Sequence, residues 1–366
     1  MYVVIKPTYH CNLACSYCYV SGRHSCNESL SKDQLEHVIN SVISYVDSQE
    51  ISPETVTFLW HGGEPLLMPI SFYEHAMAIQ QYLVSNSSRR IAIKNKMQTN
   101  LFSLNDEWVN FFKSNKWQLS TSLDGPPKIH DSQRMTKEGN RTHRRILGNI
   151  ESLKTNGVNV GVVCVLTRLG VPYIDEIYAF FKERGINFRL NDIAPYASCN
   201  SNLLTEKEYT DSMIKLFDLW FNDEDNSITI QNLLEFSASL ISRTTLCCNA
   251  LKNCQDSFLG IDPAGNVFPC GRFCGNNDFV FGNLFSESLS SILSCEMRQK
   301  LLRRNALIIK ECANCQYSDI CNGGCLHDAV LKYGSYEAPS RLCSSYKSIF
   351  RHMEVALKTK FNLPKI

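Results

Sequence analysis

The chain has 366 residues, with 37 lysines and arginines against 36 aspartates and glutamates, so its charges nearly cancel. The balanced charge and the lack of a basic stripe argue against a nucleic-acid partner. No run approaches the roughly 20 apolar residues of a membrane span. The N-terminal run "MYVVIKP" also lacks the parts of a signal peptide, so we expect a cytoplasmic protein with no membrane partner.

The first 230 or so residues alternate between predicted strands and predicted helices. Short runs rich in Val, Ile, Phe and Thr predict strands at 2–7, 55–60, 90–100, 117–124, 158–167 and 186–195. A capping box from Ser31 to Gln34 predicts the start of the first helix, and a second box from Ser71 to Glu74 predicts the start of the next.

Two glycines, Gly157 and Gly185, stand where helices are expected to stop. Six β–α units in series predict an α/β fold with a parallel sheet. Because a closed barrel of this type has eight units, we predict a partial (β/α)6 TIM-like barrel. In such sheets the chemistry lies at the carboxyl ends of the strands.

The sequence changes character after the barrel. A helical rhythm persists in "ITIQNLLEFSASLISR", and then irregular loops rich in Gly, Asn, Pro and Cys follow. A loop-rich region of this kind needs metal to hold its shape. We therefore predict two domains, a barrel at 1–230 and a C-terminal loop-rich metal-binding domain at 231–366.

The number and spacing of the cysteines also point to metal. The chain has 17 cysteines, an odd number for a disulfide framework, and many stand at short regular spacings. In "TYHCNLACSYCYV" the triplet Cys11, Cys15 and Cys18 directly follows the first predicted strand. Three thiolates can hold three irons of a 4Fe–4S cluster and leave the fourth iron open, although part of a zinc site is an alternative.

The run "CNLACSYC" resembles the signature of radical S-adenosylmethionine (SAM) enzymes. The resemblance implies that SAM binds the open iron, that one electron cleaves it, and that the resulting radical takes a hydrogen atom from the substrate. The stretches "WHGGEPLL", "MQTN", "TSLDGP" and "HDSQR" resemble further parts of the family's pattern. They imply that Gln98 faces the substrate and that SAM is bound by Tyr17, Gly62, Gly63, Glu64, Pro65, Ser122 and Arg134.

The late cysteines resemble the SPASM extension, which carries two auxiliary 4Fe–4S clusters. The similarity to anaerobic sulfatase maturases implies two interleaved ligand sets, and hence three 4Fe–4S clusters in the chain. The first set would be Cys248, Cys254, Cys270 and Cys325, and the second Cys312, Cys315, Cys321 and Cys343. A pair of zinc ribbons is the alternative. Cys247 is an alternative to Cys248 as a ligand, whereas Cys274 and Cys295 are not assigned to either ligand set.

Two positions depart from the sulfatase-maturase pattern. In that family an aspartate base follows the third auxiliary ligand, and a tyrosine stands two places after the triplet. Here the two positions hold Gly271 and Val20. Because a general base must be within reach of its proton, formylglycine formation is in doubt. Candidate replacement bases are Asp262, Asp278 and Asp192. His61 either lines the pocket or is a core histidine, and the core interpretation is favoured.

We therefore expect a peptide maturase that installs an intrapeptide cross-link, either a cyclophane carbon–carbon bond or a thioether. The alternatives are a sulfatase maturase that oxidises Cys or Ser to formylglycine, a peptide epimerase with Cys274 as its hydrogen donor, and a non-catalytic zinc protein. The enzymatic alternatives imply a peptide or protein substrate and a one-electron donor such as flavodoxin or ferredoxin. Cys164 is expected in the core, and Cys26 and Cys199 in loops. Arg272 is expected at the surface, with binding of a substrate carboxylate as the alternative.

Overall fold

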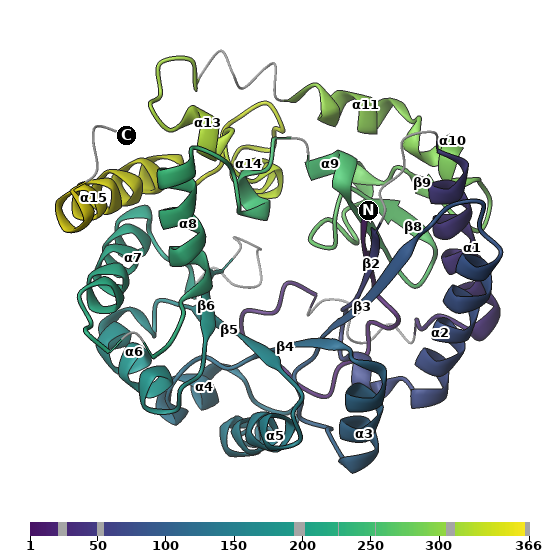
Figure 1. Ribbon diagram of the computed structural model, residues 1–366, viewed down its shortest axis with the longest axis horizontal. Helices are drawn as coiled ribbons and strands as arrows, with labels where there is room; N and C mark the ends of the chain where they lie inside the picture. Colours follow the sequence, from purple (N-terminus) through teal and green to yellow (C-terminus); the bar gives the residue numbers. More distant parts are fainter. Residues whose placement is uncertain are drawn as a thin grey trace.

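The fold is a parallel sheet bent into an open barrel, with helices around its outside (Figure 1). The structure is a computed structural model, and it describes residues 1–20, 28–49, 55–193, 202–225, 227–252, 254–304 and 312–362. Cys26 and Cys199 lie outside these residues. The strands are β1 (Tyr2–Ile5), β2 (Thr55–Trp60), β3 (Ala92–Gln98), β4 (Gln118–Ser122), β5 (Val160–Leu166), β6 (Phe188–Asp192), β7 (Phe258–Ile261), β8 (Asn266–Phe268) and β9 (Gly282–Asn283).

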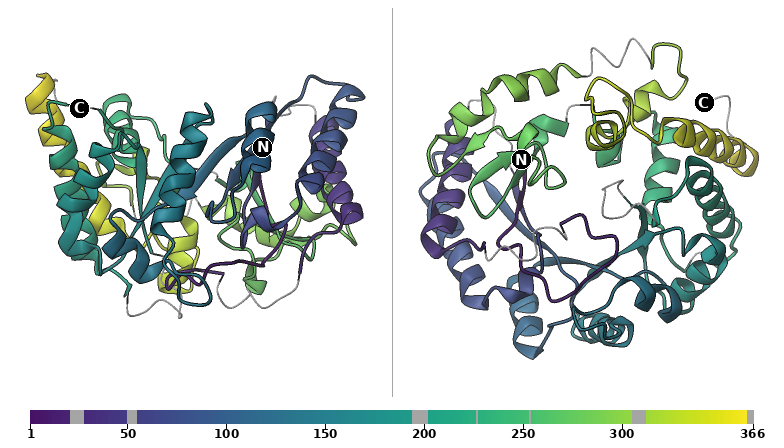
Figure 2. Two further views of the ribbon diagram at one scale, coloured as in Figure 1. Left: turned by 90° about the horizontal axis from the view of Figure 1, so that it is seen from below. Right: turned by 180° about the vertical axis from the view of Figure 1, so that it is seen from behind.

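The first six strands pair in parallel and in chain order, which confirms the predicted α/β partial barrel. The helices that follow them cover the outer face of the sheet (Figure 2). They are α1 (Lys32–Ser48), α2 (Ile70–Ser85), α3 (Asp106–Asn115), α4 (Pro127–Gln133), α5 (His143–Thr155), α6 (Ile174–Glu183) and α7 (Glu206–Phe221).

Helix α1 begins as the sequence predicts. The Ser31 hydroxyl accepts a hydrogen bond from the Gln34 backbone, and the Gln34 side chain accepts one from the Ser31 backbone. The predicted box from Ser71 to Glu74 is wrong, because α2 has Pro69 at its N-cap and makes no side-chain cap bond. Ser71 therefore already lies inside the helix. Both predicted stop glycines adopt left-handed backbone angles, with φ of +76° at Gly157 and +57° at Gly185.

The C-terminal region fills the gap between β6 and β1 and completes the ring (Figure 1). Its strand β7 pairs in parallel with β1, so that Tyr2 lies opposite Phe258 and Ile5 opposite Ile261. The strands β8 and β9 then extend the sheet in the antiparallel sense. This region is more helical than the sequence suggested, with α8 (Gln231–Ser242), α9 (Cys254–Ser257), α10 (Leu289–Leu293), α11 (Glu296–Leu302), α13 (Ser318–Cys321), α14 (Leu326–Tyr333) and α15 (Cys343–Phe361).

The sheet runs without a break from the barrel into this region, since β7 is hydrogen-bonded to β1. Helix α15 packs against α7, and α8 packs against β6. The two parts therefore share one hydrophobic core. The domain boundary near residue 230 stays a prediction. No helix among the described residues is both long and apolar enough to cross a membrane.

Candidate active site

The cysteine triplet lies in the loop that follows β1, at the carboxyl end of the sheet. Backbone bonds fix this loop to the segment after α4: Ala14 donates to the Met135 carbonyl at 2.8 Å, and Ser16 donates to the Gln133 carbonyl at 2.9 Å. Within the loop, the Cys18 amide donates to the Cys15 carbonyl at 3.1 Å. The loop is therefore held by protein contacts that do not depend on a cluster.

The three thiols of the triplet lie close enough to influence one another electrostatically. Burial raises the pKa of the Cys11 thiol to about 12 and that of Cys18 to about 11. Buried thiols of this kind remain protonated until a metal displaces the protons. No three His, Cys, Asp or Glu side chains among the described residues gather as ligands of a single ion. A 4Fe–4S cluster spreads its thiolates over separate irons, so the triplet fits such a cluster.

The two glycines after β2 allow that loop to touch the cysteine loop. A Cβ atom on Gly62 would lie 2.6 Å from the Thr8 carbonyl oxygen, and one on Gly63 would lie 2.0 Å from the carbonyl oxygen of His10. Any side chain at either position would collide with backbone. The glycines therefore set the close contact between the loops after β1 and β2.

Glu64 is fully buried beside these glycines. Its carboxylate accepts hydrogen bonds from the Leu66 amide at 2.8 Å, the Thr99 hydroxyl at 2.6 Å and the Asn100 amide at 2.7 Å. Burial raises the pKa of Glu64 to about 6, against the opposing effect of these donors. In this structure Glu64 thus joins the loop after β2 to the loop after β3.

A second buried network links the cysteine loop to the loop after β4. The Tyr17 hydroxyl donates to Asp124 Oδ2 at 2.6 Å and accepts from Arg134 Nη1 at 2.6 Å. Asp124 is fixed in turn by the Val165 amide at 2.9 Å and by Gln133 Nε2 at 2.9 Å. The buried Nε atom of Arg134 has no hydrogen-bond partner. An open donor on a buried guanidinium fits an anionic ligand such as a carboxylate.

Gln98 and Ser122 meet at the ends of β3 and β4. Gln98 Nε2 donates to Ser122 Oγ at 3.3 Å, and the amide oxygen of Gln98 accepts a hydrogen bond from Ser120. Both side chains are partly exposed. The sequence predicted all three residues Gln98, Ser122 and Arg134 at strand ends. Gln98 and Ser122 end β3 and β4, but Arg134 is the C-cap of α4 and reaches the cysteine loop through Tyr17.

The late cysteines form two groups in the structure. Cys270 has Cys248 among its close electrostatic neighbours, Cys254 has both of these, and Cys325 has Cys270. Cys321 has as its neighbours Cys343, Cys312 and Cys315. The two groups have the membership of the two predicted ligand sets, and the assignment of each cysteine as a ligand stays a prediction.

The remaining thiols have other surroundings. Cys247 donates to Glu235 at 3.2 Å, which favours Cys248 as the ligand of that pair. Cys295 caps α11 by accepting a bond from the Arg298 amide at 3.4 Å. Cys164 is in the core, as predicted.

The chain matches the radical SAM superfamily over residues 5–181 and the SPASM iron–sulfur cluster-binding domain over residues 248–316. The chain belongs to the radical SAM/SPASM enzymes. Its cofactors are therefore SAM and 4Fe–4S clusters, and the zinc-protein alternative is wrong.

Relatives match this radical SAM/SPASM chain over nearly its full length. It is 27% identical to the serine-type anaerobic sulfatase-maturating enzyme of Bacteroides thetaiotaomicron, over 96% of this chain and 89% of that one. It is 25% identical to the cysteine-type enzyme of Clostridium perfringens, over 96% of this chain and 95% of that one. The fold matches a solved structure of anSMEcpe with bound AdoMet and Cp18Cys peptide, with a TM-score of 0.85, 24% identity and coverage of 99% and 98%.

The three candidate bases of this radical SAM/SPASM chain have different surroundings. Asp262 closes the β7–β8 turn, where its Oδ1 atom accepts from the Ala264 amide at 3.1 Å and the Asn266 amide at 2.9 Å. Asp278 is exposed in a short helix, Asn277–Phe279. Asp192 forms an ion pair with Arg341. Asp262 thus stabilises a turn, Asp278 faces solvent and Asp192 balances the charge of an arginine. A catalytic role for any of the three stays a prediction. Arg272 is only partly exposed and pairs with the buried Asp328 at 2.8 Å.

Sequence reasoning missed a polar cluster between β1 and β2, which we call the Lys6–Tyr19–His61 cluster. Lys6 is fully buried, and its Nζ donates to the Tyr19 hydroxyl at 3.1 Å. The same hydroxyl lies 3.1 Å from His61 Nε2. The buried Nδ1 atom of His61 has no hydrogen-bond partner. Burial, together with the charge of Lys6, lowers the pKa of His61 to about 3, so its ring is neutral.

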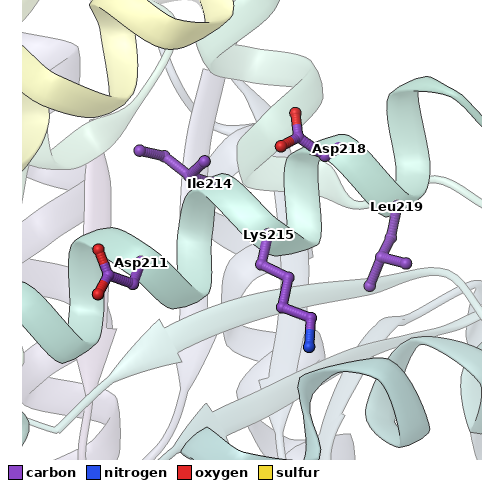
Figure 3. A pocket seen from close by; sticks show the side chains of 5 residues that line it. All are labelled: Asp211, Ile214, Lys215, Asp218 and Leu219. Carbon is purple, nitrogen blue, oxygen red and sulfur yellow. The ribbon is translucent and has the colours of Figure 1, made fainter.

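Two surface cavities lie away from the cysteine triplet. One cavity follows α7 and is lined by Asp211, Ile214, Lys215, Asp218 and Leu219 (Figure 3). Another lies where α7 approaches α14 and is lined by Leu204, Thr205, Glu206, Leu331, Lys332 and Arg341. Neither cavity is lined by a cysteine. The candidate site is therefore located by the strand ends and the thiols, and not by a cavity.

Proposed function

We propose that the chain is a sulfatase-type maturase, which oxidises a cysteine or serine side chain of a peptide or protein to an aldehyde. The end-to-end match with serine-type and cysteine-type sulfatase-maturating enzymes carries this proposal. The pairing of β7 with β1 supports it, because it joins the region that carries the late cysteines directly to the barrel sheet. A donor such as flavodoxin or ferredoxin would supply the electron for SAM cleavage.

The proposed reaction requires the side chain to lose a hydrogen atom, a proton and an electron. SAM, when bound, supplies the radical that takes the hydrogen atom. The protein must take the proton, and the electron would leave through the auxiliary clusters. A cysteine would give a thioaldehyde that water converts to the aldehyde with release of sulfide, whereas a serine would give the aldehyde directly.

His61 is our candidate for the proton acceptor. Its ring is neutral, one nitrogen is held by Tyr19, and the other has no partner. Its pKa of about 3 makes His61 a weak base in the free protein, so it serves in this role only if the bound substrate brings its pKa closer to the working pH. Lys6 and Tyr19 would hold the ring in place. Asp262 and Asp278 remain alternatives for this role.

We expect His61→Phe to lower product formation about 100-fold while SAM cleavage continues, because the radical would form but the proton would have no acceptor. Product and 5′-deoxyadenosine are quantified together by mass spectrometry. His75→Phe is the matched control, since His75 lies on the surface of α2 beside Glu36. If His61→Phe kept the normal ratio of product to 5′-deoxyadenosine and Asp262→Asn lowered it, Asp262 and not His61 would be the base.

We further propose that Arg134 binds the carboxylate of SAM through its open Nε donor. Arg134→Lys removes the planar fork and one charge-assisted hydrogen bond, so SAM is expected to bind about 10- to 100-fold more weakly. Anaerobic calorimetry on the reconstituted enzyme measures the dissociation constant. Arg141→Lys, at an exposed position in the next turn, is the control. An unchanged constant in Arg134→Lys would remove Arg134 from the SAM site.

A second candidate function is the intrapeptide cross-link, and Gly271 favours it. A Cβ atom at this position would lie 2.6 Å from Val4 Cγ1, so a carboxylate residue after Cys270 requires the Val4 side chain to shift. The fold also resembles that of Streptococcus suis SuiB bound to the precursor peptide SuiA, with a TM-score of 0.64 and 18% identity, over 93% of this chain and 75% of that one.

Anaerobic turnover distinguishes the two functions. The reduced enzyme is incubated with SAM and either a Cys-x-Pro-x-Arg or a Ser-x-Pro-x-Arg peptide, and the products are treated with an aldehyde-trapping reagent. A trapped aldehyde on either peptide supports the sulfatase-type reaction. Cleaved SAM with no aldehyde contradicts it, and a peptide two mass units lighter that resists trapping supports the cross-link.

A further inference from the structure

Arg304 is a buried arginine just beyond the end of α11, with 6% of its surface exposed. All three of its nitrogens donate to backbone carbonyls: Nε to Tyr336 at 2.8 Å, Nη1 to Gly324 at 3.3 Å and Nη2 to Ala338 at 3.1 Å. The guanidinium is therefore fixed in one orientation. Three backbone anchors hold it in place, but none of them neutralises its charge.

The side chain lies between the two auxiliary cysteine groups. Gly324, which accepts one of its bonds, lies between Cys321 of the second group and Cys325 of the first, and the Gly324 amide donates to the Cys321 carbonyl at 2.8 Å. The thiols that interact electrostatically with Arg304 are Cys325 and Cys254 from the first group and Cys312 and Cys321 from the second. The same cation thus faces both groups.

Arg304 has no carboxylate partner among the described residues, since none of their ion pairs includes it. An unpaired buried charge is strongly unfavourable, and an arginine cannot shed its proton to escape the cost. A 4Fe–4S cluster held by four thiolates is anionic, and reduction adds one further negative charge. Two such clusters on either side would supply the counter-charge that the protein lacks.

We propose that Arg304 is an electrostatic positioning residue shared by the two auxiliary clusters, which makes both of them easier to reduce. A fixed cation stabilises the reduced, more negative form of each cluster more than the oxidised form. Because both clusters face the same cation, its removal is expected to lower both potentials. The role depends on the two clusters and not on the identity of the substrate, so it can fail or hold independently of the proposed function.

The test is an anaerobic redox titration of the reconstituted full chain, followed by electron paramagnetic resonance. Arg304→Met removes the charge and keeps most of the volume. At a fixed potential, the ratio of reduced to oxidised auxiliary clusters is expected to fall about tenfold, which is 59 mV for a one-electron couple. The SAM cluster is expected to keep its potential. Arg304→Lys retains the charge, so its auxiliary clusters are expected to have potentials much closer to those of the unaltered chain.

Arg298→Met is the matched control. Arg298 is a partly buried arginine on α11, and unlike Arg304 it pairs with a carboxylate, Asp256 at 3.3 Å, so its positive charge is already offset within the protein. Iron and sulfide content, measured on every variant, separates a change of potential from loss of a cluster. If Arg304→Met and Arg298→Met had the same auxiliary-cluster potentials at full iron content, the proposal would be overturned. If Arg304→Met does not hold its iron, Arg304→Gln replaces it, and equal titrations for Arg304→Gln and Arg304→Lys would overturn the proposal in the same way.

Discussion

Replacing Cys11, Cys15 and Cys18 together with alanine is expected to abolish SAM cleavage and to leave both auxiliary clusters in place. The triplet lies in a loop held by its own backbone bonds to Met135 and Gln133, so the barrel does not need its cluster to fold. The auxiliary cysteines belong to other segments, beyond residue 247. We expect iron to fall from about twelve to about eight atoms per chain, because one cluster of three is lost.

The measurement combines iron and sulfide analysis with quantification of 5′-deoxyadenosine after anaerobic reduction. The matched control removes three other thiols, in Cys164→Ala, Cys247→Ala and Cys295→Ala combined. These lie in the core, against Glu235 and at the cap of α11, so full iron and normal cleavage are expected. SAM cleavage that survives loss of the triplet would place the radical-generating cluster elsewhere.

Replacing Glu64 with alanine is expected to destabilise the fold by about 3–5 kcal/mol. The substitution leaves three buried donors without an acceptor, namely the Leu66 and Asn100 amides and the Thr99 hydroxyl. It also frees the loop after β2 from the loop after β3, next to the triplet. The thermal midpoint is expected to fall by at least about 5 °C.

The midpoint is measured anaerobically by calorimetry on the reconstituted chain, before and after addition of SAM. Glu64→Gln is the control, because its amide oxygen still accepts hydrogen bonds in the same place, and we expect it to lose less than half as much stability. A fall in SAM affinity with no fall in the midpoint would show that Glu64 acts on the cofactor and not on the fold.

The barrel was predictable because its signals are local. Each strand is a short β-branched run, and the box from Ser31 to Gln34 needs only four residues to act. The second box failed because Pro69 starts α2 two residues ahead of Ser71. Helix α15 was not predicted, although Tyr346, Ile349, Phe350 and Met353 recur at helical spacing and are buried along one face.

The site was predictable in part for the same reason. The three cysteines of the triplet stand at short spacings within one loop, and Gly62 directly follows a predicted strand. Tyr17 lies within the cysteine motif, and Arg134 lies further on, at the end of α4. The Lys6–Tyr19–His61 cluster could not be read in this way, because its three residues come from separate segments and meet only through the packing of β1 beside β2. The signal that sequence offers is a lysine inside an otherwise apolar strand end, "VVIKP", where a buried charge needs a partner.

The pairing of β1 with β7 bears on how the chain is made. Strand β1 ends at Ile5 and β7 begins at Phe258, so one edge of β1 has no partner until some 250 later residues have left the ribosome. At roughly 5–20 residues per second, this wait lasts on the order of 10–50 s. Contacts between such distant segments also form slowly. We therefore expect the nascent barrel to expose an unpaired, aggregation-prone edge beside the cysteine loop throughout that time, until the C-terminal region covers it.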